Sequence, residues 1–201
     1  MGPTGNKTLI IEGMIVHYYV ARQLQIQCNN FLVCLTNRYR TMLLAGGGIG
    51  VTPIIGMLKD IYDMNIPGGS DGTPAPRLGA QQEHTIDTIY FLWAMPSITD
   101  YETFRKEVNE FIERAKAPGK PNLVPLIHIT RSKETLEEPL VAGRPNIVEI
   151  YQRMMKGQLS RHASLVFVCG PQPLVAECWD RSIKYTLKGS HIDFHHEIFE
   201  F

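Results

Sequence analysis

The chain has 201 residues, of which 44% are hydrophobic and 20% charged, a composition that suits one domain or one domain with a fragment of another. Its 20 basic and 20 acidic residues give a formal net charge of zero, which argues against nucleic acid as a partner. Because no apolar run approaches the roughly 20 residues that span a bilayer, and the N-terminus has no secretory signal, we expect this chain itself to be soluble.

The first predicted elements surround a cluster of glycines. Residues 1–40 give no clear pattern and form a poorly defined N-terminal segment. Residues 41–45 suit a buried strand, residues 46–50 allow a turn with positive φ, and Pro53 fits the first turn of a helix. Free amides at the start of such a helix, together with its dipole, can hold a pyrophosphate. A purely structural glycine turn is the alternative.

Strand-like and helix-like segments alternate from this turn to the C-terminus. The expected strands and helices are strands at 86–93, 123–130, 164–169 and 191–197, and helices at 97–115, 145–156 and 173–187. This alternation predicts an α/β fold over residues 41–201, with a Rossmann-like parallel sheet and helices on both of its faces. Residues 66–83 are rich in glycine and proline, and we expect a mobile surface insertion there.

The loops that follow the strands carry candidate binding groups. In an open α/β sheet the ligand lies outside the carboxyl ends of the strands, so these loops are expected to line one crevice. Thr130 and Arg131 follow the third strand and offer a hydroxyl and a guanidinium. An arginine here can clamp a phosphate, and a surface salt bridge is the alternative. Arg144 precedes Pro145, which fits the start of a helix.

A cysteine stands at the end of the fourth strand. Gly170 and Pro171 follow Cys169 and constrain the turn that presents its thiol. Taken alone, Cys169 is more simply explained as a small buried residue. The four cysteines of the chain have no C-x-x-C spacing, so the sequence indicates no metal site, no disulfide framework and a reducing compartment.

Four motifs together resemble a known family. They are Gly47-Gly48-Ile49-Gly50-Val51-Thr52-Pro53, Gly143-Arg144-Pro145-Asn146, Cys169-Gly170-Pro171 and the C-terminal Phe201. Their order over about residues 40–201 resembles the C-terminal NAD(P)H-binding domain of the ferredoxin-NADP reductase superfamily. The Gly-Arg-Pro-Asn motif and the aromatic C-terminus narrow the resemblance to the NADPH oxidases and ferric reductases.

The resemblance implies that this domain binds NADPH. Residues 47–53 would hold the pyrophosphate and the adjoining ribose. Thr130 and Arg131 match the pair that reads the 2′-phosphate in many relatives, and Arg144 would help to position the cofactor. No acidic residue ends the second strand to bind the ribose of NADH, so with Arg131 present we expect NADPH. Trp93 stands near the place where many NADPH oxidases have an arginine.

The resemblance also implies where hydride transfer takes place. Cys169, Gly170 and Pro171 would face the nicotinamide, with Cys169 near the carbon that gives up the hydride. Phe201 would stack on the flavin ring until the nicotinamide displaces it, although an aromatic residue packed only for stability is the alternative. Because hydride transfer is chemistry of the cofactors, the protein needs no general acid or base for it.

The sequence has no flavin-binding motif and no haem-bearing transmembrane helix, so it is expected to be an excised domain of a membrane flavohaem oxidoreductase. Its implied partners are a flavin-binding domain, of which residues 1–40 are a candidate edge, and a haem-bearing transmembrane domain. Electrons would pass from NADPH to FAD and through haems to ferric iron or dioxygen, from the cytosolic face of a membrane. The isolated domain is expected to be inactive. The reductase domain of a soluble FAD-dependent flavoprotein and a non-enzymatic nucleotide-sensing module are the alternatives.

Overall fold

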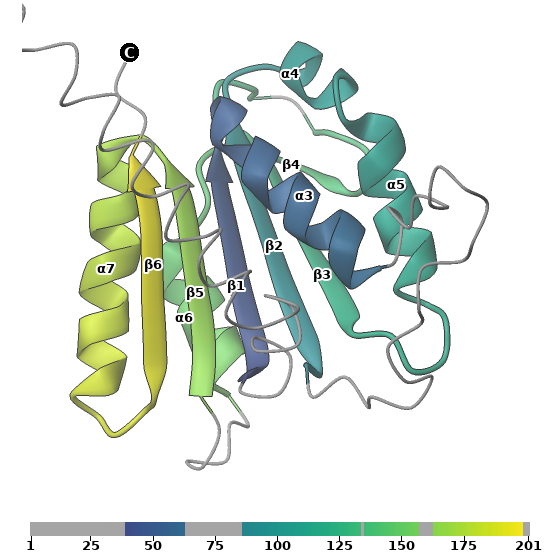
Figure 1. Cartoon of the computed structure of the whole chain (residues 1–201). Coiled ribbons are helices and arrows are strands. Elements are labelled where there is room, and N and C mark those ends of the chain that lie inside the picture. Colours follow the sequence, from purple (N-terminus) through teal and green to yellow (C-terminus); the bar gives the residue numbers. More distant parts are fainter. Residues whose placement is uncertain (1–38, 63–85, 134, 157–162, 199–201) are drawn as a thin grey trace, which may run out of the picture. The chain divides into compact units, whose positions relative to one another are not determined.

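A six-stranded parallel sheet forms the centre of the domain (Figure 1). The computed structural model describes residues 39–62, 86–133, 135–156 and 163–198. The strands are β1 (Tyr39–Gly47), β2 (Thr88–Met95), β3 (Asn122–Ile129), β4 (Leu140–Ala142), β5 (Ala163–Gly170) and β6 (Ile192–Ile198). They lie in the order β4-β3-β2-β1-β5-β6, and each neighbouring pair is parallel.

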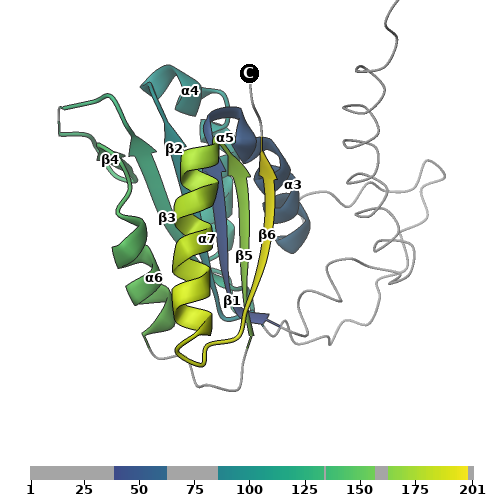
Figure 2. The same ribbon diagram turned by 90° about the vertical axis from the view of Figure 1, so that its left-hand side faces the viewer.

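Helices cover both faces of this sheet (Figures 1 and 2). The helices of one face are α3 (Thr52–Ile61), α4 (Ile98–Glu102) and α5 (Arg105–Arg114), and those of the other are α6 (Ile147–Met155) and α7 (Gln172–Thr186). The prediction of an α/β fold with a Rossmann-like parallel sheet and helices on both faces is therefore confirmed.

Apolar runs in the strands explain why both faces are covered. Residues 42–45 of β1 have no exposed surface, as expected for a central parallel strand that is buried on both sides. On one side α3 buries a helical stripe made of Ile54, Ile55, Leu58 and Ile61. On the other side Leu43 and Ala45 share a buried cluster with residues of α6 and α7. The core thus fixes β1 and β5 as rigid supports for the loops at their carboxyl ends.

The strand order reverses next to β1. From β1 the chain moves outward through β2 and β3 to β4, and it then returns to the other side of β1 to form β5 and β6. Such a reversal leaves a crevice outside the carboxyl ends of the two strands at the switch point, here β1 and β5. The glycine turn follows β1, and Cys169-Gly170-Pro171 closes β5.

Two elements differ from the sequence prediction. The single helix expected over 97–115 was wrong, because the structure has two helices with a break at Thr103 and Phe104. Phe104 has φ −122° and ψ 13°, which is not helical, and its ring contacts Trp93 at a centroid distance of 6.0 Å. This packing ends α4 early. Strand β4 was not predicted, since three residues are too few for a recognisable alternation.

Several predictions fall outside the described residues. The insertion expected at 66–83 lies wholly there, as do Phe201 and all of the N-terminal segment except Tyr39 and Arg40, which belong to β1. Within the part of the chain that the structure describes, no helix is both long enough and apolar enough to cross a bilayer.

Candidate functional site

The glycine turn connects β1 to α3 at the carboxyl edge of the sheet (Figure 1). After β1 ends at Gly47, residues 48–51 form one turn of 3-10 helix, η1, and α3 begins at Thr52. Gly48 has φ +55°, a left-handed conformation that favours glycine. The hydroxyl of Thr52 donates a hydrogen bond of 2.8 Å to the carbonyl of Ile49 and fixes the end of η1. Pro53 lies in the first turn of α3, as predicted.

Three glycines let this turn press against the end of β5. A Cβ atom on Gly50 would overlap the carbonyl oxygen of Cys169, and one on Gly47 would overlap the ring of Pro171. A Cβ atom on Gly170 would lie 2.9 Å from the backbone nitrogen of Gly47. The backbones of the two motifs are therefore in direct contact. None of these three positions has room for a larger side chain.

A hydrogen bond from β2 holds the glycine turn from a third side. The indole nitrogen of Trp93 donates to the carbonyl of Gly48 over 3.0 Å. Trp93 is 1% exposed and packs against Tyr101 and Phe104. Sequence reasoning treated this position only as the place of a missing arginine. The glycine that accepts the bond carries no side-chain signal, so the sequence alone could not pair the two residues.

A groove of about 790 Å³ runs along the carboxyl edge next to this turn. Predicted site residues that line it are Gly47, Gly48, Ile49, Thr130, Arg131, Arg144, Gly170 and Pro171. Ala94, Met95 and Pro96 line it from the end of β2. The remaining predicted residues in the described part of the chain do not line it; they are Gly50, Val51, Thr52, Pro53 and Cys169. The fold thus brings loops after β1, β2, β3 and β5 to one groove.

Thr130 and Arg131 differ in what they offer to this groove. The backbone nitrogen and the hydroxyl of Thr130 both donate to the carbonyl of Met95, over 2.7 Å and 3.2 Å. Its hydroxyl proton is therefore committed to β2. The side chain of Arg131 is exposed and has no ion-pair partner among the described residues. The salt bridge weighed as its alternative role is thus not seen within that part of the chain.

Arg144 is held in place by its neighbours. Gly143 has φ +90° and donates its N–H to the carbonyl of Ile129 over 3.0 Å. The Nδ1 atom of His128 lies 3.2 Å from the carbonyl of Gly143, and because a carbonyl only accepts, this nitrogen carries the proton. Burial lowers the pKa of His128, which favours the neutral ring. The side chain of Asn146 accepts a 3.2 Å bond from the N–H of Glu149 and caps α6.

Cys169 is fully buried, and its thiol lies 3.7 Å from a carboxylate oxygen of Glu197 on β6. Burial raises the pKa of Cys169 from 9.0 to about 12, and the charge of Glu197 and its hydrogen bond with the thiol add to the effect. At neutral pH the sulfur therefore stays protonated and donates to Glu197, so it is not a thiolate nucleophile. Sequence reasoning missed Glu197, whose only signal was its place at the end of a predicted strand.

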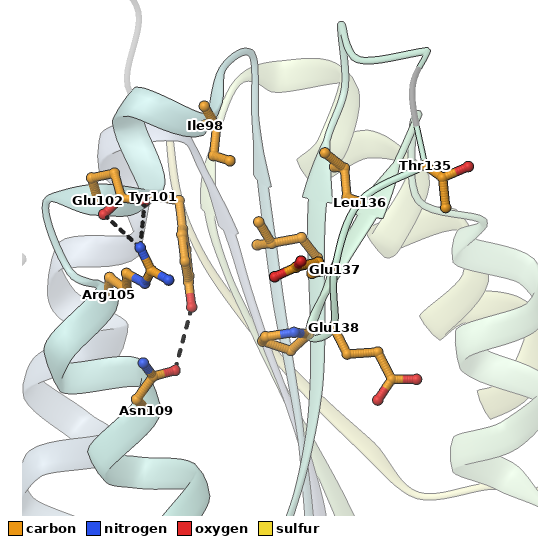
Figure 3. Close-up of a pocket in the computed structure, with 11 residues that line it drawn as sticks. Ile98, Tyr101, Glu102, Arg105, Asn109, Thr135, Leu136, Glu137 and Glu138 are labelled. Atoms are coloured by element: carbon orange, nitrogen blue, oxygen red, sulfur yellow. Dashed lines mark hydrogen bonds and ion pairs between the residues drawn. The ribbon is translucent and has the colours of Figure 1, made fainter.

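A second groove, of about 340 Å³, lies between α4, α5 and the segment that leads to β4 (Figure 3). Arg105 forms a 3.1 Å ion pair with Glu102, and the hydroxyl of Tyr101 donates to Asn109 over 3.5 Å. None of the predicted site residues lines this groove. Its charged groups are already paired with one another or open to solvent, so it offers no cradle for a nucleotide comparable to the glycine turn.

The residues of the carboxyl-edge groove fit a dinucleotide. A phosphate needs close approach to backbone amides, and glycines without side chains line the groove at the start of η1. A phosphomonoester needs a cation, and two exposed guanidiniums from different loops, Arg131 and Arg144, line the same groove.

Comparison with known proteins agrees with this fit. Residues 39–139 match the family "Ferric reductase NAD binding domain". The chain is 26% identical over 188 residues to respiratory burst oxidase homolog protein B of Oryza sativa subsp. japonica, covering 80% of this chain and 21% of that protein. It is 26% identical over 183 residues to a heavy chain of the superoxide-generating NADPH oxidase of Dictyostelium discoideum, covering 81% of this chain and 24% of that protein.

Among solved structures, the chain is similar to the flavohem-like FAD/NAD-binding domain of nitric oxide dioxygenase from Vibrio cholerae O1 biovar El Tor, with a TM-score of 0.43 and 12% identity. That similarity covers 79% of this chain and 52% of the other. The chain spans only 21–22% of the length of the plant oxidases that it matches. The family match spans half of the chain and includes β1, the glycine turn, β2 and β3. The chain belongs to the ferric reductase NAD-binding domain family.

Proposed function

We propose that the chain binds NADPH in the carboxyl-edge groove and presents it for hydride transfer to FAD. The observation that carries this proposal is the glycine turn, which is pressed against Cys169-Gly170-Pro171 at the switch point of the sheet. Residues 47–53 would hold the pyrophosphate and the adjoining ribose, because Gly47 and Gly48 line the groove there without side chains. The nicotinamide would lie near the end of β5, beside Gly170 and Pro171.

Arg131 is the residue that would recognise the 2′-phosphate. Its guanidinium lines the groove and has no ion-pair partner among the residues described. Thr130 would lie beside Arg131 without donating to the phosphate. Its hydroxyl proton is engaged with the carbonyl of Met95, and its oxygen, like that of the phosphate, can only accept a hydrogen bond. Arg144, on its anchored loop, would supply a second positive charge to the cofactor.

Bound NADPH supplies the hydride, and FAD on a neighbouring domain accepts it. The contribution of this chain would be orientation. Cys169 would keep a neutral thiol beside the nicotinamide site, and Glu197 would hold the proton of that thiol at a fixed place. Phe201, outside the described residues, would cover the flavin until the nicotinamide arrives. Replacing Cys169 by alanine should spare NADPH binding and slow hydride transfer in the full-length enzyme.

The partners would be the flavin-binding domain and the haem-bearing transmembrane domain of one longer membrane protein. The relatives support this proposal, because they are about four to five times longer than the matched segment and include proteins named as NADPH oxidases. Of the N-terminal segment 1–40, Tyr39 and Arg40 belong to β1 and the rest would be an edge of the flavin domain; residues 41–201 would be the NAD(P)H-binding domain together with the start of β1. Electrons would then pass through haems to ferric iron or dioxygen, from the cytosolic side of the membrane.

Calorimetric titration of the 201-residue chain with NADPH and with NADH tests the proposal. We expect weak NADPH binding and weaker NADH binding, and no NADPH-dependent reduction of ferricyanide, because we do not expect these 201 residues alone to hold FAD. Binding of neither nucleotide would refute the assignment of the groove. Tight NADPH binding without any partner domain would instead support a nucleotide-sensing module, and robust ferricyanide reduction would contradict the dependence on a flavin domain.

A further inference from the structure

Trp93 contacts the glycine turn with one polar atom from within the core. Its indole N–H donates to the carbonyl of Gly48 over 3.0 Å. The ring itself is clamped, with Tyr101 at a centroid distance of 6.1 Å and Phe104 in an edge-on arrangement at 6.0 Å. Because Trp93 is 1% exposed, this geometry is set by packing and does not depend on solvent.

The direction of this hydrogen bond determines the direction of the next amide. In a trans peptide unit the C=O and the following N–H lie in one plane and point in opposite directions. With the carbonyl of Gly48 directed at Trp93, the N–H of Ile49 is directed away from Trp93. Gly48 and Ile49 both line the groove, whereas Trp93 does not. The hydrogen bond from Trp93 therefore holds the carbonyl oxygen of Gly48 toward the core, and the N–H of Ile49 points in the opposite direction.

The orientation of the Gly48–Ile49 peptide determines whether the turn presents an N–H or an oxygen to the groove. Rotation of the peptide that follows Gly48 changes ψ of Gly48 and φ of Ile49. Gly48, at φ +55°, tolerates such a change, whereas the β-branched Ile49 resists it. A rotated Gly48–Ile49 peptide would present an oxygen in place of an N–H, and an oxygen repels phosphate. Among the described side chains, Trp93 donates to the carbonyl oxygen of Gly48 and so adds to the resistance against this rotation.

We propose that Trp93 is a positioning residue for the pyrophosphate of the dinucleotide, acting through the Gly48–Ile49 peptide. This inference rests on the proposed function, because it assumes that the groove holds NADPH. Trp93 touches no cofactor in this arrangement. Its role is to keep the amide of Ile49 available before the nucleotide arrives, so that binding does not have to reorganise the turn.

The variant Trp93→Phe isolates the N–H from the ring. Phenylalanine keeps an aromatic group between Tyr101 and Phe104 but leaves the carbonyl of Gly48 without this donor. The matched control is Tyr101→Phe, which removes a polar hydrogen from the same aromatic cluster, where the hydroxyl of Tyr101 donates to Asn109 and not to the turn. A third protein carries at position 93 the benzothiophene isostere of tryptophan, in which sulfur replaces N–H at nearly constant shape.

Three probes separate positioning from general damage. NADPH and NADH both contain the pyrophosphate, whereas adenosine 2′-phosphate has the 2′-phosphate without it. We expect Trp93→Phe and the isostere to weaken NADPH and NADH by the same factor, about 2- to 10-fold, as for loss of one hydrogen bond. Adenosine 2′-phosphate should bind unchanged, and Tyr101→Phe should bind all three probes like the wild type.

Nuclear magnetic resonance adds a direct signature. The chain has two tryptophans, and Trp179 is 48% exposed on α7, so its indole N–H signal serves as an internal reference. On titration with NADPH the indole signal of Trp93 should shift, because a phosphate on the Ile49 amide strengthens the hydrogen bond at the other end of the same peptide. The signal of Trp179 should stay in place.

The outcomes separate this inference from the proposed function. If the wild type binds neither NADPH nor NADH, the proposed function fails and this inference fails with it. If the wild type binds NADPH and both the isostere and Trp93→Phe bind it equally well, the inference alone is wrong. An equal loss of all three probes in the isostere, or an indole signal of Trp93 that does not respond to NADPH, would likewise reduce Trp93 to a core residue.

Discussion

The two ends of the carboxyl-edge groove are built in different ways. At the β1–β5 end, backbone packs on backbone, and Gly47, Gly50 and Gly170 leave no room for side chains. At the β3 end, two exposed arginines extend from loops that are anchored by backbone hydrogen bonds. The first end is part of the core, and the second consists of exposed side chains on surface loops. Under the proposed function, the geometry common to all dinucleotides would depend on the fold, whereas the choice between NADPH and NADH would depend on replaceable side chains.

The largest effect should come from Gly50→Ala. Its new Cβ atom would overlap the carbonyl of Cys169, so the turn or β5 must move, and we expect a loss of about 1 to 3 kcal/mol in the free energy of unfolding with nucleotide binding abolished. Gly56→Ala is the control, because a Cβ atom there meets nothing within 4 Å on helix α3 and should stabilise by about 0.5 to 1 kcal/mol. Urea denaturation and calorimetry measure both effects, and retained binding in Gly50→Ala would contradict the rigidity of this end.

At the other end, Arg131→Ala should act on binding alone. Losing a charge-assisted pair to the 2′-phosphate should weaken NADPH by about 1.5 to 3 kcal/mol and leave NADH nearly unchanged. The free energy of unfolding should stay within about 0.5 kcal/mol, because the side chain is exposed. Arg153→Ala, an exposed arginine on α6 that does not line the groove, is the control. Equal losses for both nucleotides would remove Arg131 from the 2′-phosphate site.

The buried end should also be sensitive to alkali. Burial raises the pKa of Cys169 from an ordinary 9.0 to about 12, so well below pH 9 both the folded and the unfolded state keep the proton and stability is unaffected. Above pH 9 only the unfolded thiol ionises, and stability falls as pH rises toward 12. Between about pH 8.5 and pH 10, Cys169→Ala should lose less stability than the wild type by about 1 kcal/mol. Identical pH slopes in urea denaturation would show that the thiol is not held neutral.

The smallest effect should come from Asn146→Ala, near the exposed end. Removing the bond from Asn146 to the N–H of Glu149 uncaps α6 and should cost about 0.5 to 1 kcal/mol of stability. Because the loop that carries Arg144 is also held through Gly143, NADPH affinity should fall less than twofold. A larger loss of affinity would mean that the cap, and not the β3 anchor, sets the position of Arg144.

Much of the fold and part of the candidate site follow from local sequence. The apolar run of β1, the glycines after it and the amphipathic stripe of α3 are contiguous, so their pattern predicts strand, turn and helix. Arg131 was expected in the crevice because parallel strands end at one edge, and Arg144 was expected at the cofactor because of the family resemblance; both line the groove.

The contacts that sequence did not predict join residues far apart in the chain. Trp93 reaches Gly48, and Cys169 reaches Glu197, through the register of neighbouring strands. Gly46 pairs with Trp93 and Cys169 with Glu197, yet nothing in either segment encodes which strand will be its neighbour. The break between α4 and α5 has the same origin, since the ring of Phe104 packs on Trp93 of a different element.

The contact between Gly50 and the carbonyl of Cys169 also limits how such domains can be recombined. A chimera that takes its glycine turn from one relative and its Cys-Gly-Pro segment from another joins two backbones that were not shaped together. The two segments form a single exchangeable module, although more than half of the chain separates them. By contrast, the exposed side chains of Arg131 and Arg144 can be replaced without disturbing this backbone contact, which under the proposed function makes them the place to engineer a change of coenzyme.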